Sequence, residues 1–418
     1  MKNKFLLIIF LLFSCSNKSV KDELVCIQLV DRNGFNETIN SEDKLKKFAE
    51  TDFNSNQPYE KVLRIYKKVK SINIFSKLTS YHQNGNIYKY LEIKDGRAFG
   101  KYFEYFPNGN MKIESIVLSG SADFSNQTDW VFNGQSKVYA ENQNLLIIFN
   151  YSNGSLENET KYFYPNKVLK TIVPYKSNEL NGEVIKFSEK GEVLEKTNYL
   201  DGKKHGASIG YYSKDNIAFL EEYERDNLIS GQYFKKNRLK VSQVKNSEGL
   251  KAIFKDNKIT QLIEYKNGKV NGKVKNFEED ELISEYVIQN DKKNGEEIIY
   301  YNFKETRTKE KKPKLLISWD NDSIHGLVKT WYKSGSLESQ KEYSLSKKNG
   351  EHFAWYKNGS VMFIEEYEND LLINGSYYQI DKKELISSVS NGEGVASLYD
   401  SDGRFLKKVK YKDGKPIE

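Results

Sequence analysis

The chain has 418 residues and a formal net charge of +7, from 65 basic and 58 acidic residues interspersed along its length. Only 38% of residues are hydrophobic and the mean hydropathy is −0.71, which argues against a thick globular core, while the mixed charge argues against a nucleic-acid partner. Twenty-nine tyrosines, 23 phenylalanines and 27 glycines against six prolines indicate strands joined by tight turns, so we expect an all-β protein.

The first 15 residues have the pattern of an export signal. Lys2 and Lys4 precede nine apolar residues, Phe5–Phe13. As a helix, these nine residues would span roughly 14 Å, well short of the ~30 Å hydrocarbon layer of a bilayer. We therefore expect residues 1–14 to be a cleaved signal peptide and not a transmembrane helix.

Leu12–Cys15 (LFSC) resembles the lipobox of bacterial lipoproteins, in which the cysteine is acylated and becomes the new amino terminus. The resemblance implies lipid attachment at Cys15, although Phe13 departs from the small residue usual at its position. Several acyl chains at about 0.8 kcal/mol per buried CH₂ give a durable anchor. Ser16 in place of aspartate implies, by analogy with lipoprotein sorting, the outer membrane of a bacterial envelope, with residues 15–23 as a tether. The alternative is that Cys15 is an ordinary cysteine of the signal peptide.

Residues 24–77 lack the regular spacing found further along and are predicted to form a small N-terminal cap. Leu24–Val30 and Lys61–Val69 favour strands. Ser41, followed by two acidic residues, is typical of a helix N-cap. The cap would cover the first repeat, because terminal repeats need a closing surface.

From residue 78 to residue 418 the sequence repeats with a period of 24 residues. Trp331–Tyr343 (WYKSGSLESQKEY) is followed 24 residues later by Trp355–Tyr367 (WYKNGSVMFIEEY). Counted from the last residue of each turn tetrad, aromatic or aliphatic residues recur four before, two after and eight after, and in several units a glycine recurs 15 after. This spacing fits origins at Gly85, Gly109, Gln143, Lys167, Gly191, Asp215, Asn257, Gly335, Gly359 and Gly403.

Each unit is predicted to be a β-hairpin. Offsets of two and eight differ by an even number, so these residues share one side of a strand and would form an apolar face opposite a polar one. Asn-Gly pairs tolerate the positive φ values of a tight turn. One hairpin alone is marginal in water, so neighbours must stack. We expect about fourteen units in an extended array that forms a long twisted sheet, interrupted by longer loops at 120–128 and 303–313.

The stretches YHQNG, YFPNG, WYKSG and WYKNG are each followed by an aliphatic residue and a distant tyrosine, and most of them by a closing glycine as well. They resemble bacterial MORN-variant repeats of the kind collected as YwqK-family antitoxins, over residues 78–418. The resemblance implies antiparallel hairpins in a row. It implies no settled activity, and the antitoxin label implies a toxin as the partner.

The sequence contains no evident constellation of catalytic or metal-ligating residues. His82, His205, His325 and His352 lack the paired spacing of a metal site, and three of them occupy positions set by the repeat. Glutamate pairs such as Glu221–Glu222 recur before tyrosine in equivalent units, which argues against a glycosidase. Nucleophile-elbow, phosphate-loop and dinucleotide motifs are missing from the sequence. We expect a non-enzymatic protein without a cofactor or metal.

The aromatic residues of the repeat are the candidate interaction surface, represented by Tyr81, Tyr105, Trp331 and Trp355. Two interpretations are open. The rings stack on a peptide, glycan or lipid headgroup, or they form the thin core between hairpins, which their regular spacing favours.

The first functional hypothesis is a lipid-anchored, non-enzymatic repeat scaffold that binds protein or envelope components. An antitoxin or immunity protein that neutralises a toxin is the alternative, and a hydrolase of an envelope polymer is a second alternative. The expected partners are the membrane, through the N-terminal lipid, and a protein or envelope component of unknown identity.

Overall fold

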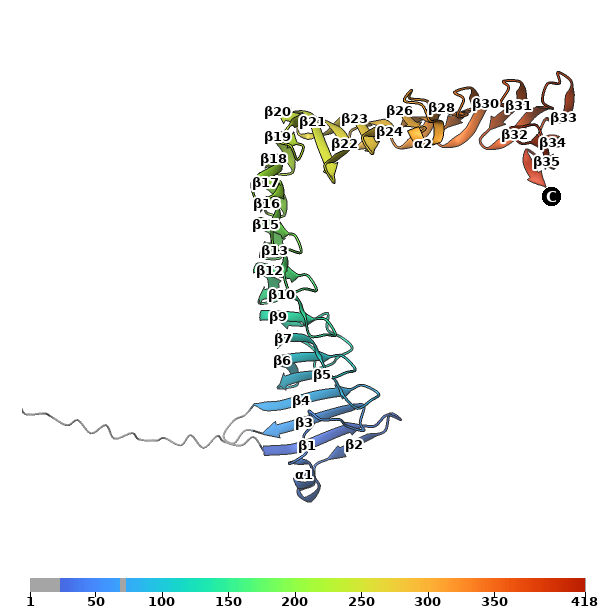
Figure 1. Cartoon of the computed structure of the whole chain (residues 1–418). Helices are drawn as coiled ribbons and strands as arrows, with labels where there is room; N and C mark the ends of the chain where they lie inside the picture. The colour runs from blue at the N-terminus through green and yellow to red at the C-terminus, as the bar shows by residue number, and fades with distance from the viewer. Residues whose placement is uncertain (1–22, 68–72, 418) are drawn as a thin grey trace, which may run out of the picture. The chain divides into compact units, whose positions relative to one another are not determined.

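The computed structural model describes residues 23–67 and 73–417 (Figure 1). The predicted signal peptide, residues 1–14, and the proposed lipid site Cys15 lie outside the described residues. Strands make up 65% of the structure and helices 3%, and the strands pair antiparallel, so the prediction of an all-β hairpin array is confirmed. Contacts divide the chain into two compact units, Met1–Gly191 and Glu192–Glu418, and each is described by itself.

In the first unit, the sheet begins in the order β2–β1–β3–β4 and then follows the chain. Three of its strands are short two-residue pieces beside longer ones. The strands are β1 (Glu23–Val30), β2 (Asn36–Ile39), β3 (Lys61–Lys67), β4 (Ile74–Tyr81), β5 (Ile87–Lys94), β6 (Arg97–Tyr105), β7 (Met111–Ser119), β8 (Val131–Phe132), β9 (Gly134–Tyr139), β10 (Leu145–Ser152), β11 (Ser155–Leu156), β12 (Asn158–Phe163), β13 (Leu169–Lys176), β14 (Glu179–Leu180) and β15 (Gly182–Phe187).

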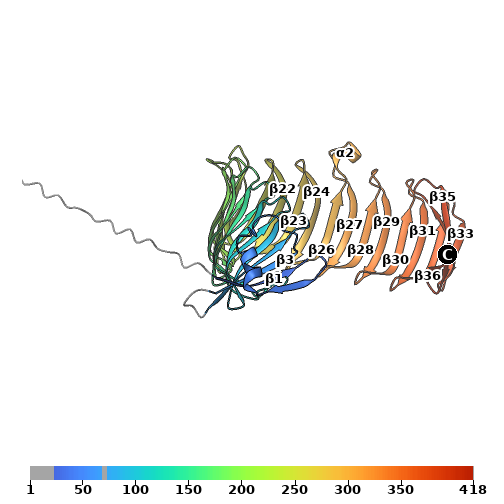
Figure 2. The ribbon, with the colours of Figure 1, turned by 90° about the horizontal axis from the view of Figure 1, so that it is seen from below.

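In the second unit, strands that follow one another in the chain lie side by side, as Figure 2 shows from β22 onward. The strands are β16 (Val193–Leu200), β17 (Lys203–Ser213), β18 (Asn216–Glu224), β19 (Asn227–Phe234), β20 (Lys240–Lys245), β21 (Glu248–Lys255), β22 (Lys258–Lys266), β23 (Lys269–Glu278), β24 (Glu281–Gln289), β25 (Lys292–Lys293), β26 (Gly295–Tyr300), β27 (Pro313–Asp320), β28 (Ser323–Trp331), β29 (Leu337–Ser344), β30 (Lys347–Trp355), β31 (Val361–Glu368), β32 (Leu371–Tyr378), β33 (Leu385–Ser390), β34 (Glu393–Tyr399), β35 (Phe405–Lys412) and β36 (Lys415–Ile417).

The cap is built on β1, which lies between β2 and β3. Helix α1 (Glu42–Phe48) packs Leu45 into a core that also contains Ile27, Val62 and Phe53. Ser41 occupies the N-cap position as predicted, but its side chain makes no capping hydrogen bond. Since β3 pairs with β4, the cap and the first repeat share one sheet.

The turn tetrads have a single left-handed residue. The amide of Gly85 donates to the carbonyl of His82 (2.9 Å), and the amide of His82 donates to the carbonyl of Asn86 (2.8 Å). Only Gly85 takes a left-handed φ, +89°, and the strand pairing shifts by one residue at Tyr81. This is a type I turn with a G1 bulge, so the prediction of a tight turn with positive φ at both Asn and Gly is wrong here. The asparagine therefore has another role.

Asparagine side chains join each tetrad to the next. The Oδ1 of Asn84 accepts the amide of Asn86 (3.1 Å), and its Nδ2 donates to the carbonyl of Pro107 in the following tetrad (2.6 Å). Asn166 donates in the same way to the carbonyl of Glu189 (2.9 Å).

Tyrosines make a parallel set of bonds between tetrads. The tyrosine three residues before the origin donates its hydroxyl to a backbone carbonyl in the next unit. The pairs are Tyr164 with Phe187 (2.8 Å), Tyr212 with Phe234 (3.0 Å), Tyr332 with Trp355 (2.6 Å) and Tyr356 with Tyr378 (2.7 Å).

At the opposite ends of the strands, two-residue turns have both residues left-handed, as at Asp95 (φ +50°) and Gly96 (φ +75°). This is the type I′ geometry that matches the twist of antiparallel strands. The closing glycine of the repeat follows. A Cβ on Gly100 (φ +108°) would lie 3.0 Å from the Cβ of Glu92, whose carboxylate accepts the amide of Lys101 (2.8 Å). The backbone conformation and the neighbouring glutamate therefore both require glycine.

Both predicted interruptions are present. The segment after β7 begins at Gly120 and packs Phe124 and Trp130 against β5–β7. The second interruption contains a helical turn, α2 (Phe303–Thr306), where the sequence predicted only a longer turn. Asn302 and Glu305 satisfy its first amides through a capping box.

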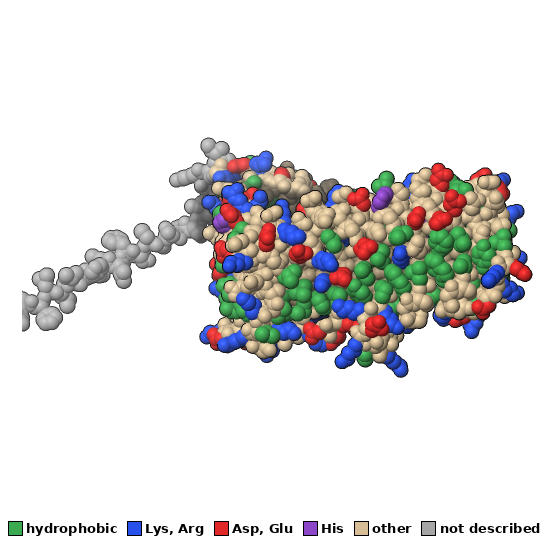
Figure 3. Space-filling model, turned by 90° about the horizontal axis from the view of Figure 1, so that it is seen from above, with side chains coloured by type: hydrophobic (Ala, Val, Ile, Leu, Met, Phe, Trp, Pro, Cys, Tyr) green, Lys and Arg blue, Asp and Glu red, His purple; other side chains and the backbone are tan. Residues whose placement is uncertain are grey.

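Strands away from the cap are half-buried on both faces. In β10 seven successive residues, Leu145–Tyr151, all have intermediate exposure. The predicted contrast between an apolar and a polar face is therefore weak, because among the described residues no second layer covers these strands. Figure 3 shows hydrophobic side chains gathered in a band on one face of the molecule.

Two stretches of the second unit, 144 residues apart, repeat the same packing. In each, an amide of one turn reaches the carbonyl of the turn two hairpins later, from Leu228 to Gly268 (2.9 Å) and from Leu372 to Gly414 (3.0 Å). The sheet is curled at both places, and each curl encloses a small core. The matching buried residues are Tyr223 and Tyr367, Leu228 and Leu372, Tyr233 and Tyr377.

The turns give a stability prediction at Lys167, which replaces the tetrad glycine and is exposed with a φ of +68°. A left-handed conformation costs a residue with a Cβ roughly 1–2 kcal/mol. Lys167→Gly should raise the free energy of unfolding by about 0.5–1 kcal/mol, after subtracting the entropy that glycine adds to the unfolded chain. The check is the urea midpoint followed by circular dichroism.

Lys190 is the matched control, because it precedes the origin of the next tetrad and has no left-handed φ. Lys190→Gly should lower the urea midpoint. A fall in the midpoint for Lys167→Gly as well would contradict the turn geometry.

Candidate binding site

Tyr81, one of the four aromatic residues predicted to lie at an interaction surface, is 5% exposed. Its hydroxyl donates to the carbonyl of Phe53 (2.9 Å), and its ring packs in the core of the cap. Burial is the main cause that raises the pKa of Tyr81 to about 12. Tyr81 is therefore part of the cap core, because a segment outside the repeat covers it.

Tyr105, Trp331 and Trp355 are half-buried. Trp355 stacks on Phe353 with ring centroids 5.8 Å apart, and its carbonyl accepts the hydroxyl of Tyr332. These three aromatics pack along the sheet and keep part of their surface exposed.

The tyrosine directly after each of these aromatics was not among the predicted site residues. Tyr356 is fully buried and Tyr332 is 9% exposed, and both carry the bonds between tetrads. The signal was visible in the sequence as the second aromatic of WYKSG and WYKNG.

A cavity of about 340 Å³ opens on the face of β3, β4, β5 and β6, bordered by Asn54 of the cap. Its volume is at the lower end of the range for small-ligand pockets. Its wall combines three cations, one carboxylate and three aromatic rings, which are Arg64, Lys77, Lys101, Glu92, Tyr90, Phe103 and Tyr105.

Strand register places these side chains in two rows. Arg64 is directly opposite Lys77, and Lys77 is opposite Glu92. Tyr90 is opposite Phe103, with ring centroids 5.7 Å apart. A charged row therefore runs beside an aromatic row.

Arg64 is a buried cation, with 7% of its surface exposed. Its Nη2 donates to the Oγ1 of Thr79 (2.8 Å), and the guanidinium lies 4.7 Å from the ring centroid of Phe53. Among the described residues it has no ion-pair partner within 4.0 Å, and its Nε has no hydrogen-bond partner.

The cost of such an arrangement is substantial. Removing an ion from water costs several kcal/mol even after relaxation. The cation–π contact and the charged hydrogen bond each return about 2 kcal/mol. They offset much of the desolvation cost but leave the charge itself without a counter-ion, so the cavity keeps a positive wall.

Glu92 does not supply that counter-ion. Its Oε2 accepts the amide of Lys101 (2.8 Å) and its Oε1 accepts the hydroxyl of Tyr90 (3.3 Å). Burial, followed by the charge of Glu92, raises the pKa of Tyr90 well above its ordinary value, so this phenol stays protonated at neutral pH.

A second cavity, of about 690 Å³, lies over β1, β3, β4 and β5, between β2 and Ala122 of the loop after β7. Its floor includes Leu63, Ile65 and Leu78. Because Leu63 and Arg64 are successive residues of one strand, the two cavities lie on opposite faces of the sheet. The second cavity fills the gap that the cap and the loop leave uncovered.

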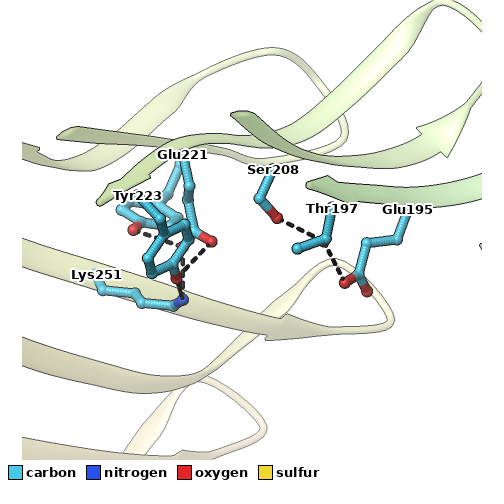
Figure 4. Close-up of polar contacts among 7 residues, drawn as sticks. Glu195, Thr197, Ser208, Glu221, Tyr223 and Lys251 are labelled. Atoms are coloured by element: carbon cyan, nitrogen blue, oxygen red, sulfur yellow. Dashed lines mark hydrogen bonds and ion pairs between the residues drawn. The ribbon is translucent and has the colours of Figure 1, made fainter. Parts of the chain in front are cut away.

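Buried carboxylates in the second unit are fully partnered. Glu221 accepts the hydroxyls of Tyr223 (2.9 Å) and Tyr233 (2.8 Å), and the Nζ of Lys251 lies 2.5 Å from it (Figure 4). Glu365 accepts the two equivalent tyrosines in the other curl. These clusters hold the curls together and have no free valence for a ligand.

Among residues 23–67 and 73–417, no group of three or more His, Cys, Asp or Glu side chains is placed to hold a metal ion. In the same part of the chain, no helix combines the length and apolar character needed to cross a bilayer.

Comparison with known families places MORN repeats in the chain. The MORN repeat variant matches residues 100–116, 156–177, 324–344 and 348–369, all within the predicted array. The protein therefore contains MORN-type repeats. No curated protein matches the chain.

Among solved structures, the chain is similar to a component of the Photorhabdus luminescens Tc holotoxin pore carrying a TccC3 mutation, with 8% identity and a TM-score of 0.16. It is also similar to TcdB2-TccC3 without its hypervariable C-terminal region, with 8% identity and a TM-score of 0.12. The matches cover 86% and 84% of this chain and 22% and 26% of those chains, so this chain spans about a quarter of their length. Scores this low support no conclusion about fold or function.

His352 gives a prediction about pH. It is 1% exposed, its ring centroid lies 4.6 Å from that of Tyr367, and its Nε2 lies 3.1 Å from the carbonyl of Glu342. Burial lowers its pKa to about 4. The unfolded pKa is about 6.5, so unfolding takes up a proton below that pH. The stabilisation is complete above pH 6.5 and falls as pH drops toward 4, with a slope of at most about 1.4 kcal/mol per pH unit.

Urea midpoints measured between pH 7 and pH 5 should therefore fall for the wild type and fall less for His352→Gln. His325→Gln is the control, because His325 is exposed, and it should behave as the wild type. Burial raises the pKa of Glu365, opposite His352, so its contribution has the reverse sign and is common to both proteins. Equal slopes for His352→Gln and the wild type would contradict the burial of a neutral ring.

Proposed function

We propose that this protein is a non-enzymatic scaffold whose repeats bind protein or envelope components. MORN repeats indicate a scaffold or binding role. The observation that carries the proposal is the surface of the array, where strands such as β10 keep aromatic and aliphatic side chains half-exposed on both faces. Exposed apolar surface of this kind is typical of interaction sites.

The proposal includes a membrane anchor at Cys15. Its support is the order of Lys2 and Lys4, the apolar run Phe5–Phe13 and the lipobox-like LFSC. A lipidated amino terminus followed by polar residues would tether the array to the envelope, and Ser16 favours the outer membrane. Acyl chains supply the affinity, since several of them together hold a protein on a bilayer.

A second candidate is an antitoxin, favoured by the likeness of the turn tetrads to YwqK-family repeats. In this case the repeats would bind one toxin that acts in the envelope. The two candidates share a binding surface and differ in whether one partner or several occupy it.

Anchoring is tested by fractionating cells that express the wild type or Cys15→Ala. The wild type should be found in the membrane fraction, and Cys15→Ala should leave it, because no acyl chain remains. Cys26→Ala, in β1, is the matched control and should stay membrane-bound. Retention of Cys15→Ala on the membrane would exclude this anchor.

The scaffold function is tested by chemical crosslinking and mass spectrometry on intact cells. We expect reproducible crosslinks from lysines of residues 78–418 to one or more envelope proteins. A single partner whose gene is toxic without this protein would identify the antitoxin. The scaffold proposal fails if no partner is crosslinked at native expression.

A further inference from the structure

We infer that the cavity beside Arg64 binds a carboxylate, supplied by an acidic side chain of a partner polypeptide. The inference rests on the proposed function in taking the partner to be a protein. The observation behind it is a buried guanidinium without a counter-ion, at the wall of a cavity with two further cations.

The charge balance of the wall favours an anion. Arg64, Lys77 and Lys101 carry three positive charges against the single carboxylate of Glu92, and Glu92 is already bonded to Tyr90 and to the amide of Lys101. The Nε of Arg64 has no partner among the described residues. Guanidinium donors form a planar fork that fits a carboxylate.

A carboxylate fits this wall better than a phosphate. Glu92 stands in the same row as the cations, and its charge repels a dianion more strongly than a monoanion. The buried position of Arg64 admits a small planar group, whereas Lys77 is half-buried and Lys101 is exposed at the rim.

The aromatic row explains why the acid would belong to a polypeptide. Tyr90 and Phe103 lie face to face beside the charged row, and Tyr105 continues it, with ring centroids of Phe103 and Tyr105 6.3 Å apart. An acidic residue in the cavity would place the next side chain of its own chain over these rings. Recognition would then combine one charge with one apolar contact.

The test uses the full chain and two tetrapeptides, acetyl-Ala-Glu-Phe-Ala-amide and the same peptide with glutamine in place of glutamate. Affinities are measured by ligand-observed NMR at low salt. The glutamate peptide should bind at least tenfold more tightly than the glutamine peptide. Inorganic phosphate and acetate serve as competitors, and acetate should displace the glutamate peptide at lower concentration.

Arg64→Met and Lys101→Gln should each reduce the affinity for the glutamate peptide at least fivefold and leave the glutamine peptide unaffected. Lys273→Gln is the matched control, because Lys273 follows the closing glycine of a later unit and its amide bonds to Glu264 as that of Lys101 does to Glu92. This variant should bind as the wild type does. If Arg64→Met does not fold, as judged by circular dichroism, Lys77→Gln and Lys101→Gln decide the result.

Equal affinity for the two peptides, unchanged selectivity in Lys101→Gln and Lys77→Gln, or stronger competition by phosphate than by acetate would overturn the inference. Crosslinked partners in cells without peptide selectivity would overturn it alone. Selective peptide binding without any crosslinked partner would overturn the proposed function alone.

Discussion

Each turn tetrad is hydrogen-bonded to the tetrad one unit further along, and the rest of the structure depends on this bond. Asn84 reaches Pro107 and Tyr356 reaches Tyr378, so two strands and two turns must bring the chain back to the same edge within 22 or 23 residues. The 24-residue period of the sequence is the length of chain that this return requires. The bond also explains why asparagine and tyrosine recur in the tetrads, since both reach beyond their own hairpin.

Because these bonds join neighbouring units, the structure is stabilised locally and needs no central core. Where more burial is present, it comes from additions to the repeat: α1 and Phe53 over β1 and β3, the loop with Trp130 over β5–β7, and the two curls of the second unit. Between these additions the sheet is a single half-exposed layer. Against such a background, a charge buried as deeply as Arg64 stands out, because little else on these strands is removed from water.

The features that the sequence predicted correctly are those set by neighbouring residues. Period, strand positions and the two interruptions follow from turn residues and alternation, which are local properties. The turn type was missed because an Asn-Gly pair is compatible with both a two-residue turn and a bulged type I turn. The burial of Tyr81 was missed because Phe53, which covers it, lies in a segment without repeats. The Arg64 cavity was missed for a related reason: its wall comes from several strands, and only their register brings Arg64, Lys77 and Glu92 into one row.

The tetrad-to-tetrad bond also sets how such a chain can change in length. Removing one complete unit leaves every remaining tetrad with a neighbour of the same kind, so the side-chain bonds re-form. Removing half a unit would bring a two-residue turn next to a tetrad, where no asparagine or tyrosine is in position to donate. The protein can therefore gain or lose reach in steps of 24 residues while keeping its fold, and the area offered to a partner grows or shrinks in the same steps.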